Sequence, residues 1–395
     1  MRAGVVEVDS RRGVRAVGQS GKARWLAVVL IGLLAGVVFG QGESRPAAAS
    51  PMASLKGVCP DRIVVQTDWF PEAEHGYTYQ LIGPGGKIDK QKGAYSGPLG
   101  DTGVELEIRA GGPYIGFQPP VAQMYADDKI FMAYMDTADQ ARNSKKLPTV
   151  AVMAPLDIGP QILMFDPKQY NFKTIADVGK AGATVLFFEG SAYMDYLLAK
   201  GFLSKKQIDG SYDGSPARWV SSAGRVVQQG FATNEPYKYE NDIKGWQRPV
   251  GFLLVHDAGY TIYQSALGVR PRTLARYGEC LKRLVPLYQQ GLVDYFANPE
   301  PVNNELLRIV KEFATFWTLS APANAWAVNQ MKKLRVISNA GNNTVGDFDM
   351  ARAQKLIDEL LPIFKGKRLE SYRPNLKAED ILTNRFIDRR IKLPF

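Results

Sequence analysis

Short apolar runs rich in β-branched residues recur along the first two thirds of the chain, with polar turns between them. A run of this kind predicts a strand when turn residues bound it. Runs that are apolar throughout, such as TVLFF at 184–188, are typical of strands covered on both faces, as in α/β proteins. The predicted strands are 62–67, 104–109, 130–134, 149–153, 161–165, 184–188, 225–231 and 251–255.

Apolar residues at helical spacing occupy 192–200 and dominate the chain from about residue 272 onward. Because such apolar stripes must be covered, we expect an α/β protein of two lobes, with a helical C-terminal tail that packs back on the first lobe. The segment 83–103 differs from both patterns. It holds seven glycines and little apolar periodicity, which predicts an irregular surface insertion.

Composition narrows the class of protein. The chain has 395 residues, 45% of them hydrophobic and 22% charged, which is typical of a globular protein with two domains. Residues 1–49 hold seven basic and three acidic side chains, so they contribute +4 of the formal net charge of +10 and leave +6 for the rest. This balance favours an anionic partner or a membrane surface. No basic cluster is interleaved with aromatic residues, so we expect no nucleic-acid partner.

The N-terminus carries an export pattern. Residues 25–40 are sixteen uncharged, mostly apolar residues that follow a basic stretch, which suits the apolar region of a secretion signal. Small residues at 47–49 offer a cleavage site, and 38–40 offer a second one. We therefore predict a signal peptide at 1–49 and a periplasmic or extracellular protein. The alternative is an uncleaved membrane anchor.

The cysteines and histidines are few. Two of each exclude a zinc ribbon or an iron–sulfur protein, and we expect no metal site. In an oxidising compartment, Cys59 and Cys280 are candidates for a disulfide. Two free, buried thiols are the alternative.

The segment 67–79, TDWFPEAEHGYTY, is the most informative for function, because no common catalytic motif occurs in the chain. A strand ends in Asp68, Trp69 and Phe70, and a polar turn then leads to His75. Aromatic rings beside an acid and an imidazole suit a planar ligand that needs stacking and hydrogen bonds. The alternative is that Trp69 and Phe70 belong to the core and that His75 caps a helix.

Four further segments follow predicted strands and carry polar or aromatic side chains: 111–114, 136–140, 189–192 and 233–237. In open α/β sheets, ligands bind where strands lead into helices. We therefore expect these junctions to line a common site.

Together these residues resemble one family. The motifs T-D-W-F-P-x-x-E-H-G, D-T-A-D-Q, E-G-S and T-N-E-P-Y occur here in the order found in solute-binding proteins of ABC importers that take up thiamine pyrimidine precursors. Nitrate, sulfonate, taurine and riboflavin binders are relatives of that group. The resemblance implies the type II periplasmic-binding-protein fold, in which two α/β lobes joined by two crossovers close on a ligand. Lobe 1 would comprise 60–157 and 258–395, and lobe 2 would comprise 158–257.

The resemblance also implies a function and a set of ligand contacts. Asp68, Trp69 and His75 would hold the ligand from one loop, and Tyr114 and Thr137 would hold it from the wall of lobe 1. The remaining residues of the set given below would hold it from lobe 2 and the hinge. A carboxylate such as Glu235 suits an aminopyrimidine, because it accepts hydrogen bonds from ring and exocyclic donors. Glu235 as a helix-capping acid and Asp257 as a structural turn residue are the alternatives. The implied site residues are Asp68, Trp69, His75, Tyr114, Thr137, Ser191, Glu235, Tyr237, Asp257 and Tyr260.

The resemblance thus predicts a monomeric binding protein for a small planar heterocycle, without a cofactor, that delivers its ligand to a permease and an ATPase. An anion or flavin binder of the same fold is the alternative ligand class. An enzyme is a second hypothesis, because relatives of this fold include a pyrimidine synthase that consumes an active-site histidine. That enzyme's cysteine-rich iron motif is missing here. A sensor or scaffold is a third hypothesis.

Overall fold

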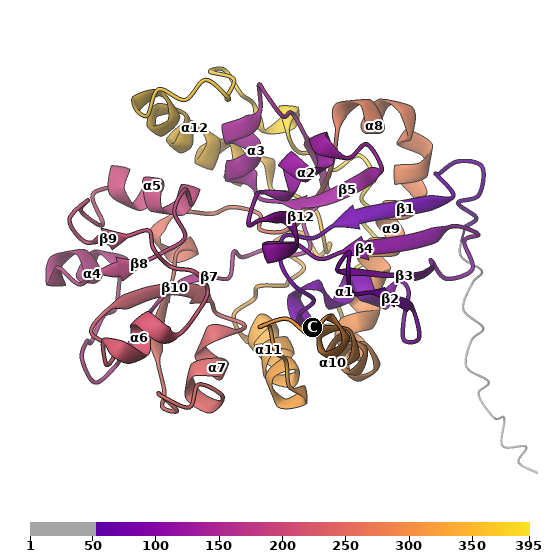
Figure 1. The fold of residues 1–395 in the computed structure, drawn as a ribbon. Helices are drawn as coiled ribbons and strands as arrows, with labels where there is room; N and C mark the ends of the chain where they lie inside the picture. Colours follow the sequence, from indigo (N-terminus) through magenta and orange to yellow (C-terminus); the bar gives the residue numbers. More distant parts are fainter. Residues whose placement is uncertain (1–52) are drawn as a thin grey trace, which may run out of the picture. The chain divides into compact units, whose positions relative to one another are not determined.

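Two β-sheets organise residues 53–395, the part of the chain that this computed structural model describes (Figure 1). The predicted signal peptide at 1–49 lies outside the described residues. The first sheet has seven strands in the order β2-β3-β4-β1-β5-β12-β6, and the second has five in the order β11-β7-β10-β8-β9. The first sheet comprises β1 (Arg62–Gln66), β2 (Lys87–Asp89), β3 (Ala94–Pro98), β4 (Glu105–Arg109), β5 (Ile130–Met135), β6 (Val150–Met153) and β12 (Ala266–Val269). The second comprises β7 (Gln161–Phe165), β8 (Val185–Leu186), β9 (Ile208–Asp209), β10 (Val227–Phe231) and β11 (Gly251–Leu254).

Helices follow most of these strands, and longer ones dominate the C-terminal part of the chain. Those before β12 are α1 (Gly76–Gln80), α2 (Pro120–Ala126), α3 (Thr137–Asn143), α4 (Ile175–Ala181), α5 (Ala192–Ala199), α6 (Ala217–Ser221) and α7 (Glu235–Asn241). Those after β12 are α8 (Pro271–Arg276), α9 (Gly278–Ala297), α10 (Glu300–Phe313), α11 (Ala321–Lys333) and α12 (Met350–Gly366). Short 3₁₀ turns are η1 (Ala73–His75), η2 (Gly112–Ile115), η3 (His256–Ala258) and η4 (Ala378–Asp380). The predicted α/β fold with C-terminal helices is confirmed.

Parallel pairing around β1 sets the direction of the first sheet. β1 pairs in parallel with β4 on one side and with β5 on the other. The carboxyl ends of these strands therefore lie at one edge, where the loop after β1 meets the loop after β4. The chain passes to the second sheet between β6 and β7 and returns between β11 and β12.

The segment 83–103 is not the irregular insertion that its glycines predict. β2 and β3 form an antiparallel hairpin, and β3 extends the first sheet by pairing with β4. Tyr95 is fully buried and its hydroxyl hydrogen-bonds with Gly83 and Glu305, which fixes the hairpin against α10. Two other short strands, β9 and β12, were not predicted either. In the tail, the chain after α12 is mostly irregular rather than helical.

The core of the first sheet is built largely by α9. Its apolar face buries Leu281, Leu284, Tyr288 and Leu292 in a core cluster that also holds residues of β1, β4 and β5, and the helix packs mainly against α1. Cys280 on the same helix forms a disulfide with Cys59, which joins the segment before β1 to a helix 221 residues downstream. Among residues 53–395, no helix combines the length and the apolar character that crossing a membrane requires.

Candidate ligand-binding cavity

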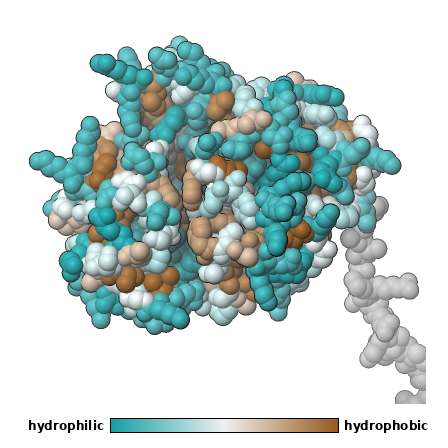
Figure 2. Space-filling view, viewed as in Figure 1, coloured by the Kyte–Doolittle hydropathy of each residue, from teal (hydrophilic) through white to brown (hydrophobic). Residues whose placement is uncertain are grey.

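A cavity of about 230 Å³ lies between the ends of the two sheets. Asp68 and Trp69 reach it from the loop after β1, and Ser265 from the position immediately before β12. Phe188 and Glu235 reach it from the loop after β8 and the start of α7. An adjoining hollow of about 450 Å³ shares several of the same lining residues. In the space-filling view, pale to brown side chains gather in the middle of the face, between the regions of the two sheets (Figure 2).

Two glycines let the loop after β1 approach the loop after β4. A Cβ atom on Gly111 would collide with the backbone of Thr67 and Asp68. Gly112 has a φ of +59°, which glycine adopts readily, and the ring of Trp69 lies beside it. The amide of Gly111 donates to the carbonyl of Trp69 over 2.9 Å. The close approach fixes Asp68 and Trp69 at the edge of the sheet.

Asp68 is the centre of a buried polar chain. His75 Nε2 lies 3.0 Å from one carboxylate oxygen, and the Ser265 hydroxyl donates to the other over 2.6 Å. Burial opposes ionisation of Asp68, but the hydrogen bond and charge of His75 and the hydrogen bond from Ser265 lower its pKa below the usual value. Burial likewise opposes the charged form of His75, yet its pKa is raised by Asp68 and by the charge of Glu72. The two groups therefore form an ion pair.

Three more carboxyl groups line the cavity. Burial raises the pKa of Glu72 to about 7, with help from the charge of Asp68. Burial also raises the pKa of Glu74, as does the charge of Glu72. The pKa of Glu235 is raised by burial as well, although its carboxylate accepts a 2.6 Å hydrogen bond from the amide of Phe231. No lysine or arginine is among the described residues that line this cavity.

Aromatic rings from both sheets form one wall. Trp69 lies 6.2 Å from Phe188, between ring centroids, and 5.7 Å from Trp317. Phe188 in turn packs on Tyr212 at 4.9 Å. These rings give the cavity flat apolar surfaces beside its carboxylates, an arrangement that suits a planar ligand with hydrogen-bond donors at its edge.

Six of the ten predicted site residues line these two hollows. Asp68, Trp69, His75, Ser191 and Glu235 line the smaller one. Tyr260, like Asp68, Trp69 and Ser191, lines the adjoining one. The structure therefore brings together side chains from three of the predicted junctions and from the return segment.

The other four predicted residues line neither hollow. Tyr114 packs on Phe70 and donates its hydroxyl hydrogen to the carbonyl of Lys90 in the β2–β3 hairpin. Thr137 is fully buried and its hydroxyl accepts from the amide of Tyr263. Tyr237 packs beside Trp326, with ring centroids 5.7 Å apart. Asp257 is exposed in η3.

Sequence reasoning missed several residues of the cavity. Glu72 and Glu74 stand inside the segment 67–79, where their place between Trp69 and His75 was a usable signal. Phe188 ends a predicted strand. Trp317 fitted the apolar stripe of a helix, and Ser265 belongs to no motif, so nothing in the sequence pointed to either. Within residues 53–395, no cluster of three or more acidic, histidine or cysteine side chains is arranged to hold a metal ion.

No family model and no curated protein matches this chain. Solved structures do. The alkanesulfonate-binding protein SsuA from Xanthomonas axonopodis pv. citri, bound to MOPS, is 13% identical and has a TM-score of 0.51, over 82% of this chain and 99% of that one. The periplasmic aliphatic sulphonate binding protein SsuA from Escherichia coli is 15% identical with a TM-score of 0.52, over 85% of this chain and 92% of that one. A periplasmic sulfonate-binding protein SsuA from Methylobacillus flagellatus is 15% identical with a TM-score of 0.51, over 83% of this chain and 93% of that one.

At these identities the likeness concerns the fold. The chain has the two-sheet fold of periplasmic binding proteins, as the sequence motifs predicted.

Proposed function

We propose that the chain is the extracytoplasmic solute-binding protein of an ABC importer, and that its ligand is a small planar heterocycle with amino groups, such as a pyrimidine. The observation that carries the proposal is the aromatic cavity between the two sheets, lined by Asp68, Glu72, Glu74 and Glu235 without a lysine or arginine among its described lining residues. Carboxylates accept hydrogen bonds from amino groups and stabilise a positively charged ring.

The lack of an unpaired cationic group among the described residues of the cavity lining argues against an anionic ligand, although the similar structures are sulfonate-binding proteins. A sulfonate that enters a buried site needs cationic or N–H donors in place of its water shell. His75 is the cationic group in this lining, and its charge is already paired with Asp68. The adjoining hollow contains Arg142, which is paired with Asp195. A flavin would have to extend into the adjoining hollow of about 450 Å³, because about 230 Å³ is below the volume range of sites for drug-sized ligands.

The proposed mechanism is closure of two lobes on the ligand. We assign 60–157 with 258–395 to lobe 1 and 158–257 to lobe 2, so that Trp69 stacks on the ligand from one lobe and Glu235 binds it from the other. Contacts that join the two sides support closure. The Asn234 amide donates to Glu72 over 3.3 Å, and the Lys238 ammonium lies 3.4 Å from the ring centroid of Trp317. A ligand that touches both lobes favours the closed state.

The binding protein would act as a monomer and deliver its ligand to a permease and an ATPase. A permease gene and an ATPase gene beside this one would support transport, whereas a neighbouring sensor kinase gene would favour the sensor alternative. The enzyme alternative would rest on His75. Its imidazole is 1% exposed and bound to Asp68, which suits a group that positions the loop rather than one that reacts.

The decisive experiment is mass spectrometry of the small molecule that copurifies with the mature protein, followed by calorimetry. We expect an aminopyrimidine or a similar heterocycle to bind and an alkanesulfonate of similar size to bind at least about tenfold more weakly. Preferential binding of the sulfonate would overturn the proposed ligand class while leaving the transport role in place.

A further inference from the structure

A second cavity, of about 730 Å³, lies on the first sheet away from the ligand-binding cavity. Arg62 begins β1 and lines this second cavity, whereas Asp68, beyond the other end of β1, lines the first. Six residues of extended chain separate them, which corresponds to roughly 20 Å. Strand β4, the β2–β3 turn, the loop before β5 and helix α8 supply most of the remaining lining. The second cavity is therefore a separate site on the molecule.

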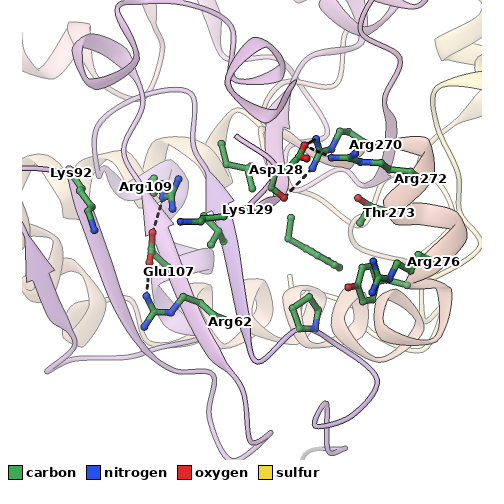
Figure 3. A pocket seen from close by; sticks show the side chains of 15 residues that line it. Arg62, Lys92, Glu107, Arg109, Asp128, Lys129, Arg270, Arg272, Thr273 and Arg276 are labelled. Carbon is green, nitrogen blue, oxygen red and sulfur yellow. Dashed lines mark hydrogen bonds and ion pairs between the residues drawn. The ribbon is translucent and has the colours of Figure 1, made fainter. Parts of the chain in front are cut away.

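Positive charge dominates this cavity. Figure 3 shows basic side chains from β1, β4, the β2–β3 turn and the loop before β5 on one side, and from α8 and the residue before it on the other. The carboxylates that line it are Glu107 and Asp128. The basic residues that line it are Arg62, Lys92, Arg109, Lys129, Arg270, Arg272 and Arg276.

The two carboxylates are already engaged, each by two arginines. Glu107 binds Arg62 over 3.1 Å and Arg109 over 2.6 Å. Asp128 binds Arg270 over 2.6 Å and also binds Arg272. These pairs hold four guanidinium groups in place. Arg62 also pairs with Glu105, Arg109 with Asp127 and Lys92 with Asp89, so the excess positive charge at the cavity wall is that of two further side chains.

Three cationic groups have donors left over. Arg270 is only 5% exposed, and its buried Nε has no hydrogen-bond partner among the described residues. Lys129 and Arg276 are exposed at the cavity and form no ion pair with any carboxylate in the part of the chain that the structure describes. Lys129 and Arg276 are therefore the groups most free to bind an anion that enters the cavity.

We propose that this cavity binds a phosphate-bearing anion. Several guanidinium groups and an ammonium around one hollow match the oxygen atoms and multiple charges of a phosphate better than a single carboxylate. The phosphate can belong to a small free polyphosphate or to the headgroup of an anionic phospholipid. The charge of the chain outside residues 1–49, +6, fits either source.

The test uses the mature protein and two probes, pyrophosphate and vesicles of phosphatidylcholine with or without phosphatidylglycerol. The variant Lys129→Gln/Arg276→Gln removes the two exposed unpaired charges of the cavity. The control Lys311→Gln/Arg389→Gln removes the same charge from exposed positions outside it. Thermal melting checks that both proteins fold, and Lys129→Gln alone serves as a second, milder variant.

We expect the wild-type protein to bind at least one probe, and the cavity variant to bind it about tenfold more weakly, while the control stays within about twofold. If the cavity variant loses pyrophosphate binding, the natural ligand of the cavity is a free phosphate compound. If it loses only vesicle binding, the ligand is a lipid headgroup. Absence of binding to both probes, or an equal loss in the control, would overturn the proposal. Affinity for the ligand of the first cavity should not change in either variant, so this test is independent of the proposed function.

Discussion

His75 Nε2 lies 3.0 Å from Asp68 Oδ1, and this ion pair joins the end of η1 to the loop after β1. The other oxygen of Asp68 accepts from Ser265, which stands immediately before β12. One carboxylate therefore fixes three segments around the candidate ligand-binding cavity. Since the imidazole is buried, its protonation should change the free energy of unfolding of the whole protein.

The first prediction is that the protein loses stability as the pH rises from about 5 to 8. The folded pKa of His75 is raised, so its contribution is fully present below the unfolded value of about 6.5 and is lost as the pH rises through the folded pKa. Burial raises the pKa of Glu72 to about 7, so ionising this group also disfavours the folded state above its unfolded value. The lowered pKa of Asp68 acts in the opposite direction, but only in acid, where stability falls as this carboxylate is protonated.

Thermal melting without ligand between pH 4 and 9 measures this dependence. His75→Gln should flatten the decline on the alkaline side, whereas His256→Gln, which changes the histidine outside the cavity, should not. A profile for His75→Gln that follows the wild type would contradict the ion pair.

The second prediction is that Trp69 and Glu235 contact the same ligand. Stacking on Trp69 contributes about 1 kcal/mol beyond area burial, and a charge-assisted hydrogen bond to Glu235 contributes roughly 1.5–3 kcal/mol. Trp69→Ala and Glu235→Gln should each weaken binding by about one to two orders of magnitude. Their effects should be non-additive, because losing either contact also weakens lobe closure.

Calorimetry with the copurified ligand on both single variants and the double variant checks this, and Tyr237→Phe, which lies outside the cavity, is the control. Wild-type affinity in a single variant would remove that residue from the site. Full affinity in the double variant would disprove binding between the two lobes.

The third prediction concerns the disulfide between Cys59 and Cys280. Because it closes a loop of more than 200 residues, the chain-entropy account gives a stabilisation of up to about 5 kcal/mol. The double variant Cys59→Ala/Cys280→Ala should therefore unfold at a lower denaturant concentration than the oxidised protein. Thiol titration of the unfolded, unreduced protein should find no free thiol, and two free thiols would end this prediction.

The fourth prediction is that the exported protein lacks roughly its first 40–50 residues. It rests on the uncharged run at 25–40 and the small residues after it. N-terminal sequencing of protein recovered from outside the cytoplasm provides the test. An intact Met1 would instead favour the membrane anchor.

Local patterns predicted β1, β4 to β8, β10 and β11, because a buried strand carries its signal in a few consecutive residues, but they missed the short strands β2, β3, β9 and β12. They predicted the loop from Asp68 to His75 for the same reason. They failed where a side chain's direction depends on distant packing. Tyr114 points toward the β2–β3 hairpin rather than the cavity. The glycines of the segment 83–103 indicated a loop, whereas the burial of Tyr95 against α10 stabilises a hairpin in that segment. Trp317 enters the cavity from a segment whose spacing indicated only a helix.

The last prediction is that ligand affinity rises with pH through the titration of Glu72. Burial raises the pKa of this carboxyl to about 7, so it is mostly neutral at pH 6 and mostly ionised at pH 8. An amino group of the ligand binds the ionised form more strongly, and only about a tenth of a group with this pKa is ionised at pH 6.

Affinity should therefore be up to about tenfold lower at pH 6 than at pH 8, for a ligand that does not itself titrate in this range. Glu72→Gln keeps an oxygen that can accept from Asn234, whose amide lies 3.3 Å from the carboxylate, but removes the titration. Calorimetry at several pH values should show a smaller pH step in this variant than in the wild type. Glu305→Gln, which changes a carboxyl outside the cavity, is the control and should keep the full step. If Glu72→Gln and the wild type share the same pH profile, Glu72 does not meet the ligand, and the carboxylate that selects it is Asp68, Glu74 or Glu235.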